Sequence, residues 1–271
     1  SSDLVLMAVA DAVHHGGDEP EITMEALEQA ARDQLTPANE QDSPVMRPQT
    51  TLDDVVLSES IRARVDEVVA AARGRRTVLE RWQLGEHLSY GKSVSALLVG
   101  PSGTGKTMCA EAIANQLNRP LLVHSVAGRG EHWRAGLEQT FQDARSHNAV
   151  LLLDDAAELL GADESEIRDA VFARMERYEG VVLVASRAAP SSKSGISGLF
   201  TYEIELPFPD EGTRARIWQT YLPETVPTEG YVDFDSLGST YELSGREIKQ
   251  AAFEAAFQAS NGDGVVTMEL L

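Results

Sequence analysis

The 271-residue sequence predicts an α/β fold, in which a parallel sheet is flanked by helices and followed by a small all-helical domain. The first observation is a regular alternation of β-prone apolar runs with helical patterns between residues 94 and 206, which is typical of a parallel sheet. The second is the end of this alternation at residues 207–209, after which only helical patterns occur. The third is a glycine-rich loop at residues 100–107, between the first apolar run and a helix.

Each expected element follows from its own pattern of apolar residues. A long amphipathic helix is expected from residue 58 to about residue 81, since Ile61, Val65, Val68 and Val69 share one helical face. The expected strands lie at about 94–99, 120–125, 149–154, 180–186 and 202–206. The other expected helices lie at about 106–117, 132–146, 163–177, 211–221, 235–240 and 244–260.

The N-terminal residues are expected to lie apart from this domain. Two helices are expected within residues 4–35, and residues 36–50, with three prolines, are expected to be a linker. The Thr-Met-Glu sequence at 23–25 recurs at 267–269, and each copy follows an Ala-rich helix. We interpret residues 1–35 as the helical tail of a preceding, similar module. The alternative is a coincidence between two capped helices.

Residues 100–107 read Gly-Pro-Ser-Gly-Thr-Gly-Lys-Thr, a complete match to the phosphate-loop pattern G-x-x-x-x-G-K-[ST]. The glycines allow backbone N–H groups to face an anion, and the helix that follows adds the dipole of its N-terminus. Lys106 is expected to reach the β- and γ-phosphates, and Thr107 to hold Mg²⁺. The fold is therefore expected to be that of a P-loop NTPase with a bound nucleoside triphosphate. The ligand-binding residues expected here are Gly100, Pro101, Ser102, Gly103, Thr104, Gly105, Lys106, Thr107 and Met108.

Two carboxylates follow the buried-strand pattern of residues 150–153. At the carboxyl edge of the sheet, Asp154 is expected to hold Mg²⁺ together with Thr107. Asp155 would then polarise the attacking water. The alternative is a pair of solvated aspartates at the end of a core strand.

The charge balance excludes some classes of ligand. The chain has 43 acidic and 23 basic residues, of which four are lysine, and a net charge of −20. This field repels nucleic acid, and no apolar run approaches the roughly 18 residues that a membrane span needs. With Cys109 as the single cysteine and no signal-peptide pattern at the start, we expect a cytoplasmic protein. The charge favours a halophilic source, with an acidic mesophilic protein of Arg-rich coding bias as the alternative.

The motifs resemble, in order, those of the AAA ATPases over about residues 50–271. The similar segments are the glycine loop, Leu152–Gly161, Ile204–Asp210 followed by Arg214 and Arg216, and Leu243–Ala252, which looks like the sensor-2 helix. The branch with the most similar motifs comprises bacterial and archaeal AAA proteins encoded beside contractile injection systems. That similarity rests on Asp53–Leu57, Arg81-Trp82 and Glu254–Ala259.

The resemblance implies ATP and Mg²⁺ as ligands, in a ring that is usually a hexamer with ATP at the subunit boundaries. It implies an α/β nucleotide-binding domain at 51–209 and a helical lid domain at 210–271. The adenine would lie among Asp54–Leu57, which includes Val55 and Val56, and the lid residues Ile217 and Gly245. Arg246 would contact the γ-phosphate from the lid, and the alternative for Arg246 is an ordinary surface cation.

Four departures from the family pattern bear on the reaction. Asp155 stands where the family has Glu, and Ser186 stands at the sensor-1 position, where the family has Asn. The residues expected to act in catalysis are Asp154, Asp155, Ser186 and Arg246. Residues 190–203, where the family has its arginine finger, contain no arginine, and residues 126–133 do not match the aromatic-glycine pore loop.

We therefore expect an ATP-hydrolysing module with slow turnover, acting in a homo-oligomeric ring as a remodelling or assembly factor. Its partner would be a protein client or an injection-system component, without nucleic acid or membrane. The alternative is a pseudo-ATPase that binds ATP to stabilise oligomer packing and hydrolyses little of it.

Overall fold

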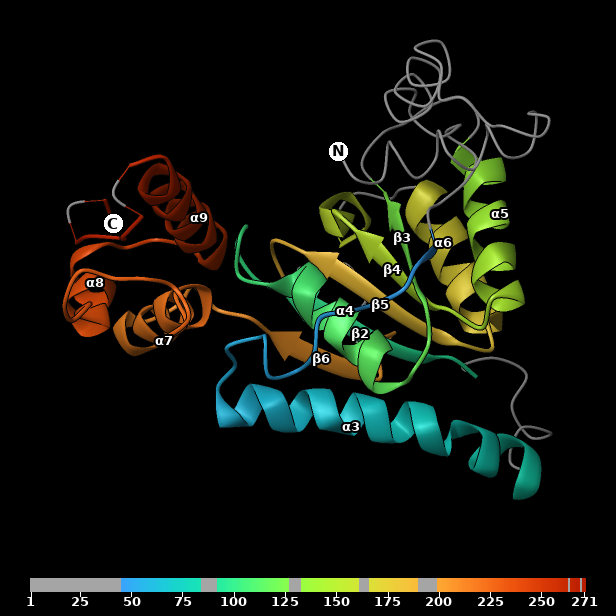
Figure 1. Ribbon diagram of the computed structural model, residues 1–271. Helices are drawn as coiled ribbons and strands as arrows, with labels where there is room; N and C mark the ends of the chain where they lie inside the picture. The colour runs from blue at the N-terminus through green and yellow to red at the C-terminus, as the bar shows by residue number, and fades with distance from the viewer. Residues whose placement is uncertain are drawn as a thin grey trace, which may run out of the picture. The chain divides into compact units, whose positions relative to one another are not determined.

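The computed structural model describes residues 45–83, 92–126, 133–160, 166–189, 199–262, 264–268 and 270–271. Within these ranges six strands form one sheet, in the spatial order β1–β3–β4–β5–β2–β6 (Figure 1). Strands β2 to β6 run parallel to one another, and β1 pairs antiparallel with β3. The predicted α/β class is confirmed. The strands are β1 (Val45–Met46), β2 (Val94–Val99), β3 (Leu121–Ser125), β4 (Val150–Asp154), β5 (Val181–Ser186) and β6 (Tyr202–Glu205).

Helices cover both faces of the sheet (Figure 1). Successive residues of a strand point to opposite faces, so that Leu152 of β4 packs with α3 and α4, whereas Leu151 and Leu153 pack with α5 and α6. This two-sided burial explains why the strands are continuous apolar runs rather than alternating ones. These helices are α3 (Glu59–Arg76), α4 (Lys106–Gln116), α5 (Trp133–Ser146) and α6 (Glu166–Arg177).

The C-terminal region is helical, as predicted, with its own small core. Its helices pack around Trp218 and Ile248, whose side chains are fully buried. The first helix is capped by Asp210, whose carboxylate accepts a hydrogen bond from the backbone N–H of Thr213. The helices are α7 (Glu211–Tyr221), α8 (Phe234–Thr240) and α9 (Gly245–Asn261).

The structure adds three elements that the sequence did not predict. Strand β1 lies inside the expected linker 36–50, where Val45 and Met46 pair with Leu122 and Leu121. A two-residue strand is too short to show an alternating pattern. The long helix α3 ends at Arg76 and continues as a π-helical turn (η1, Thr77–Arg81), and a 3₁₀ helix (η3, Ala156–Leu160) follows β4.

The predictions for residues 1–35 concern a part of the chain that lies outside the described residues. The two helices and the preceding module therefore stay predictions.

Candidate nucleotide-binding site

The glycine loop joins β2 to α4 and presents the free N–H groups of the first helical turn. Gly105 is the N-cap of α4, with a φ of 94°, and it supplies no side-chain cap to those groups. Gly103 has a φ of 80°, a conformation that other residues adopt only with strain. Uncapped N–H groups at a helix N-terminus, together with the helix dipole, form an anion-binding site.

Lys106 lies at the start of α4 and folds over the loop. Its Nζ donates hydrogen bonds to the carbonyl oxygens of Gly100 and Pro101, each at 2.7 Å. Burial lowers the pKa of the Lys106 ammonium, while the nearby Asp154 carboxylate opposes this effect. Gly100 and Pro101 themselves do not line the cavity described below, so their contribution is to hold this cation beside it.

Thr107 and Asp154 come together across two elements. The Thr107 hydroxyl, on α4, donates a hydrogen bond of 3.2 Å to Oδ2 of Asp154 at the end of β4. A hydroxyl and a carboxylate are oxygen ligands that Mg²⁺ accepts in triphosphate sites. No cluster of three or more His, Cys, Asp or Glu side chains suited to a metal occurs in the described part of the chain. The residues therefore fit a Mg²⁺ ion that shares its ligands with a bound triphosphate rather than a cage made of protein alone.

Asp155 has a strained backbone and a paired side chain. Its φ is 53°, in the left-handed region, and its backbone N–H donates to Oδ1 of Asp154 at 2.8 Å. Its own carboxylate accepts a hydrogen bond from the guanidinium of Arg187, with 3.4 Å between Oδ1 and Nη2. Asp155 thus fixes one oxygen of Asp154 through its main chain and contacts Arg187 through its side chain.

Ser186, at the end of β5, is buried and lines the cavity. Its hydroxyl donates to the carbonyl of Ala188 at 2.8 Å and accepts from the Ala188 N–H at 3.3 Å. The hydroxyl proton is therefore used in a hydrogen bond within a local turn and does not point to the phosphate end of the cavity. A contact of this hydroxyl with a phosphate or a water would require the turn to open, and the catalytic role expected for Ser186 stays a prediction.

The start of α9 contacts the glycine loop directly. The backbone N–H of Arg246 donates to the carbonyl of Gly103 at 3.2 Å. Ser244 caps α9 in a capping box with Glu247, and a Cβ on Gly103 would lie only 2.6 Å from the Ser244 Oγ. Gly245 also lies against this carbonyl, so the lid helix and the phosphate loop share one contact surface.

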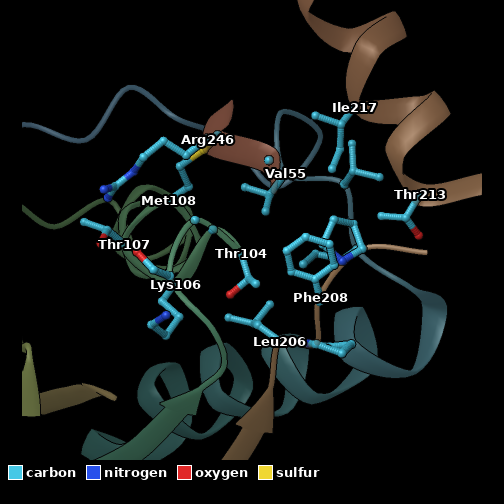
Figure 2. A pocket seen from close by; sticks show the side chains of 18 of the residues that line it. Val55, Thr104, Lys106, Thr107, Met108, Leu206, Phe208, Thr213, Ile217 and Arg246 are labelled. Atoms are coloured by element: carbon cyan, nitrogen blue, oxygen red, sulfur yellow. The ribbon is translucent and has the colours of Figure 1, made fainter. Parts of the chain in front are cut away.

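These residues line one cavity of about 470 Å³, a size that is usual for small-molecule sites. Figure 2 shows Lys106, Thr107 and Arg246 at one end, and the apolar side chains of Val55, Phe208 and Ile217 at the other. A cavity with charged groups at one end and apolar groups at the other suits a molecule with an anionic part and an aromatic part. Of the predicted residues, the lining includes Val55, Val56, Ser102, Gly103, Thr104, Gly105, Lys106, Thr107, Met108, Asp154, Asp155, Ser186, Gly245 and Arg246.

Several lining residues were missed by the sequence analysis. Phe208, at the junction of the sheet and the lid, is 42% exposed and lines the apolar end. An aromatic residue between two prolines at a domain junction was the available signal. Tyr221, which also lines the cavity, donates its hydroxyl to the Met108 sulfur at 3.7 Å, and Lys249 lies 5.9 Å from the centre of the Tyr221 ring. Arg187, which follows Ser186, also lines the cavity, and its contact with Asp155 had no sequence signal.

Two expected departures fall largely outside the described residues. Residues 127–132 of the pore-loop region and residues 190–198 of the arginine-finger region are not described. The predictions for both regions therefore rest on the sequence alone.

Comparisons with known proteins agree with the motifs. The model of the AAA family, ATPases associated with various cellular activities, matches residues 96–207. A putative 26S proteasome regulatory subunit homolog of Methanothermobacter thermautotrophicus is 32% identical over 180 residues, which are 60% of this chain and 48% of that protein. A proteasome-activating nucleotidase of Methanopyrus kandleri is 28% identical over 251 residues, which are 82% of this chain and 55% of that protein. The ATP-dependent zinc metalloprotease FtsH of Acidothermus cellulolyticus is 28% identical over 241 residues, which are 79% of this chain and 34% of that protein.

This chain thus spans from about a third to about half of the length of these relatives. Among solved structures, a chain from work on the structural basis of katanin self-assembly has a TM-score of 0.60 at 20% identity, over 79% of this chain and 72% of that one. That likeness shows the fold. None of the relatives given above is an injection-system protein, so the branch expected from the sequence has no support from them. Residues 96–207, with the glycine loop and Asp154 at the ends of their strands, form an ATPase domain of the AAA family.

Proposed function

We propose that this module binds ATP with Mg²⁺ in the cavity between the glycine loop and the lid, and hydrolyses it slowly. The observation that carries the proposal is the contact of Thr107 with Asp154, beside the uncapped N-terminus of α4. This arrangement supplies a place for phosphate and two oxygen ligands for the metal at adjacent positions. The apolar end of the cavity, with Val55, Phe208 and Ile217, suits the adenine ring.

Each residue has a distinct task in the proposed reaction. The N–H groups of the loop and the Lys106 ammonium would bind and orient the phosphates, with Lys106 exchanging its two carbonyl partners for phosphate oxygens. Thr107 and Asp154 would hold Mg²⁺, which neutralises charge on the β- and γ-phosphate oxygens when bound. Asp155 would accept a hydrogen bond from the attacking water, and Arg246 would contact the γ-phosphate from the lid.

A pseudo-ATPase remains the second candidate, and two contacts favour it. The Asp155 carboxylate is paired with Arg187, and the Ser186 hydroxyl is committed to Ala188. Both groups would have to change partners before they could act on a water or a phosphate. The intact loop, Asp154 and Arg246 favour hydrolysis. Steady-state phosphate release, with Asp154→Ala as the background, separates the two functions, because a pseudo-ATPase would release no more phosphate than this variant.

We further propose that the module works in a homo-oligomeric ring, of the kind the AAA resemblance implies, and that its partner is a protein client. A component of a contractile injection system is the client that the sequence resemblance favours. Sedimentation of the wild-type chain with and without ATP tests the ring. A monomer at every protein concentration, with ATP bound, would contradict it.

Binding itself is tested by Lys106→Ala. Since Lys106 supplies a mobile cation at the phosphate end, its loss should abolish the stabilisation by ATP, which at 100 times the dissociation constant is about 2.7 kcal/mol in the wild type. The measurement is the melting temperature with and without Mg-ATP. Lys92→Ala is the matched control, because Lys92 pairs with Glu179 at 3.5 Å and does not line the cavity. An ATP-induced shift that survives in Lys106→Ala would overturn the proposed site.

A further inference from the structure

We propose that Arg187 is a catalytic arginine acting in cis, which stabilises the charge on the γ-phosphate in its own subunit, and that its pair with Asp155 is the resting arrangement. The inference rests on the proposed ATPase function. It assigns to Arg187 the task that the AAA resemblance gives to an arginine from a neighbouring subunit. Residues 190–203, where that arginine would be expected, contain none.

The position of Arg187 is set by the sheet. It follows Ser186, the last residue of β5, and β5 lies between β4, which ends in Asp154, and β2, which leads into the glycine loop. The hydrogen bonds between the buried Ser186 hydroxyl and the Ala188 backbone fix the turn that contains Arg187. Arg187 therefore leaves the sheet at the same edge as the phosphate loop, and it lines the same cavity.

Arg187 lies on the wall of the cavity that holds the proposed phosphate site. Lys106 from the glycine loop and Arg246 from the start of α9 line the same cavity. Three cations facing one space from the loop, the sheet edge and the lid form a site for a highly charged anion.

The pair with Asp155 is weak enough to exchange. The Arg187 side chain is 67% exposed, that of Asp155 is 49% exposed, and one hydrogen bond of 3.4 Å joins them. Exposed ion pairs of this kind contribute little to stability, whereas arginine forms strong bidentate hydrogen bonds with phosphate. Binding of a triphosphate would therefore draw Arg187 to the γ-phosphate and release the Asp155 carboxylate toward the water.

Asp155 and Arg187 then have different roles in the hydrolysis of ATP. The water oxygen forms a bond to the γ-phosphorus, while the bond from this phosphorus to the bridging oxygen breaks and its electron pair leaves with ADP. The water proton passes to Asp155 and from there to solvent. Arg187 keeps its protons and donates hydrogen bonds to the γ-phosphate oxygens, where negative charge must be stabilised.

The first test compares Arg187→Ala and Arg187→Lys with the wild type. Loss of one such donor is expected to lower kcat by about 10²-fold, and lysine should not rescue it because its ammonium cannot form the bidentate contact. The affinity for ATP should fall while that for ADP stays unchanged, a readout that does not depend on turnover. Arg64→Ala is the control, since the Arg64 side chain is similarly exposed, at 61%, and pairs with Glu67 at 3.0 Å outside the cavity.

The second test separates action in cis from action in trans. Arg187→Ala is mixed with Lys106→Ala, which keeps Arg187 but cannot bind ATP. Recovery of activity in the mixture would mean that Arg187 serves a neighbouring site, and would overturn the proposal; no recovery is expected. Unchanged ATP-to-ADP selectivity in Arg187→Ala, or faster turnover, would also overturn it. Failure of the wild type to bind ATP would instead refute the proposed function.

Discussion

At the scale of single residues, the two aspartates after β4 have different surroundings. Asp154 is held at both oxygens, by the Thr107 hydroxyl and by the N–H of Asp155. The Asp155 carboxylate has no such support from the glycine loop and instead contacts Arg187. Its side chain is one methylene shorter than the glutamate that the AAA resemblance implies, and catalytic positioning is sensitive to about 1 Å. The identity of Asp155 is therefore expected to limit turnover.

Lengthening this side chain tests the point. Asp155→Glu should raise kcat, because the carboxylate then extends further toward the attacking water, while Asp154→Ala should remove Mg²⁺-dependent hydrolysis. Asp155→Asn is the matched control: asparagine tolerates the left-handed backbone at φ 53° but lacks the charge. Phosphate release under saturating Mg-ATP is the measurement. Turnover of Asp155→Asn equal to that of the wild type would show that the carboxylate has no catalytic role.

At the scale of secondary-structure elements, the site depends on the contact between the glycine loop and the first turn of α9. The carbonyl of Gly103 accepts from the Arg246 N–H, and Ser244 packs where a side chain at position 103 would lie. A change in the loop conformation, such as that caused by phosphate binding, must therefore act on the lid. This contact is a physical link between nucleotide binding and the position of α7 to α9.

We expect Gly103→Ala to break this link. Its Cβ would lie 2.6 Å from the Ser244 Oγ and 2.9 Å from the Ser244 Cβ, on a backbone with a φ of 80°. The strain should destabilise the fold by about 1–3 kcal/mol and weaken ATP binding. Gly136→Ala is the control within α5, where a Cβ meets nothing within 4 Å and should stabilise by about 0.5–1 kcal/mol. Urea unfolding of both variants measures the difference in stability, and the affinity for ATP tests the link. ATP binding as tight in Gly103→Ala as in the wild type would contradict the coupling of loop and lid.

The elements of the sheet and lid could be predicted because each is long enough to show its period. The strand Val150–Asp154 and the helix Gly245–Asn261 lie within a residue or two of their expected bounds. Strand β1 could not be predicted, because two residues carry no period and their partner lies more than seventy residues away. The residues of the site likewise include some that a local pattern predicts and some that it does not. The glycine loop is a local motif, whereas the pairing of Asp155 with Arg187 depends on side-chain contacts between two strand ends.

At the scale of the whole molecule, repulsion between negative charges lowers the stability of the folded state. The chain has a net charge of −20. The ion pairs given for the described residues each have at least one exposed partner, as in Arg62–Asp53 and Arg64–Glu67. Such pairs contribute at most about 1 kcal/mol each. Repulsion between the surplus carboxylates is spread over the surface and is not offset by these pairs, so dissolved salt is expected to change stability more than any single contact.

Stability should therefore rise with salt. The Debye length falls from about 10 Å at 0.1 M to about 3 Å at 1 M, so salt removes repulsion between distant carboxylates before it weakens ion pairs in direct contact. We expect the melting temperature to increase from 0.1 M to about 2 M KCl, and most of the increase to occur below about 1 M, where screening changes most. Sucrose at matched water activity is the control, because it stabilises proteins without screening charge. A melting temperature that falls steadily with KCl, or one that rises equally in sucrose, would contradict both the electrostatic explanation and the halophilic origin expected from the sequence.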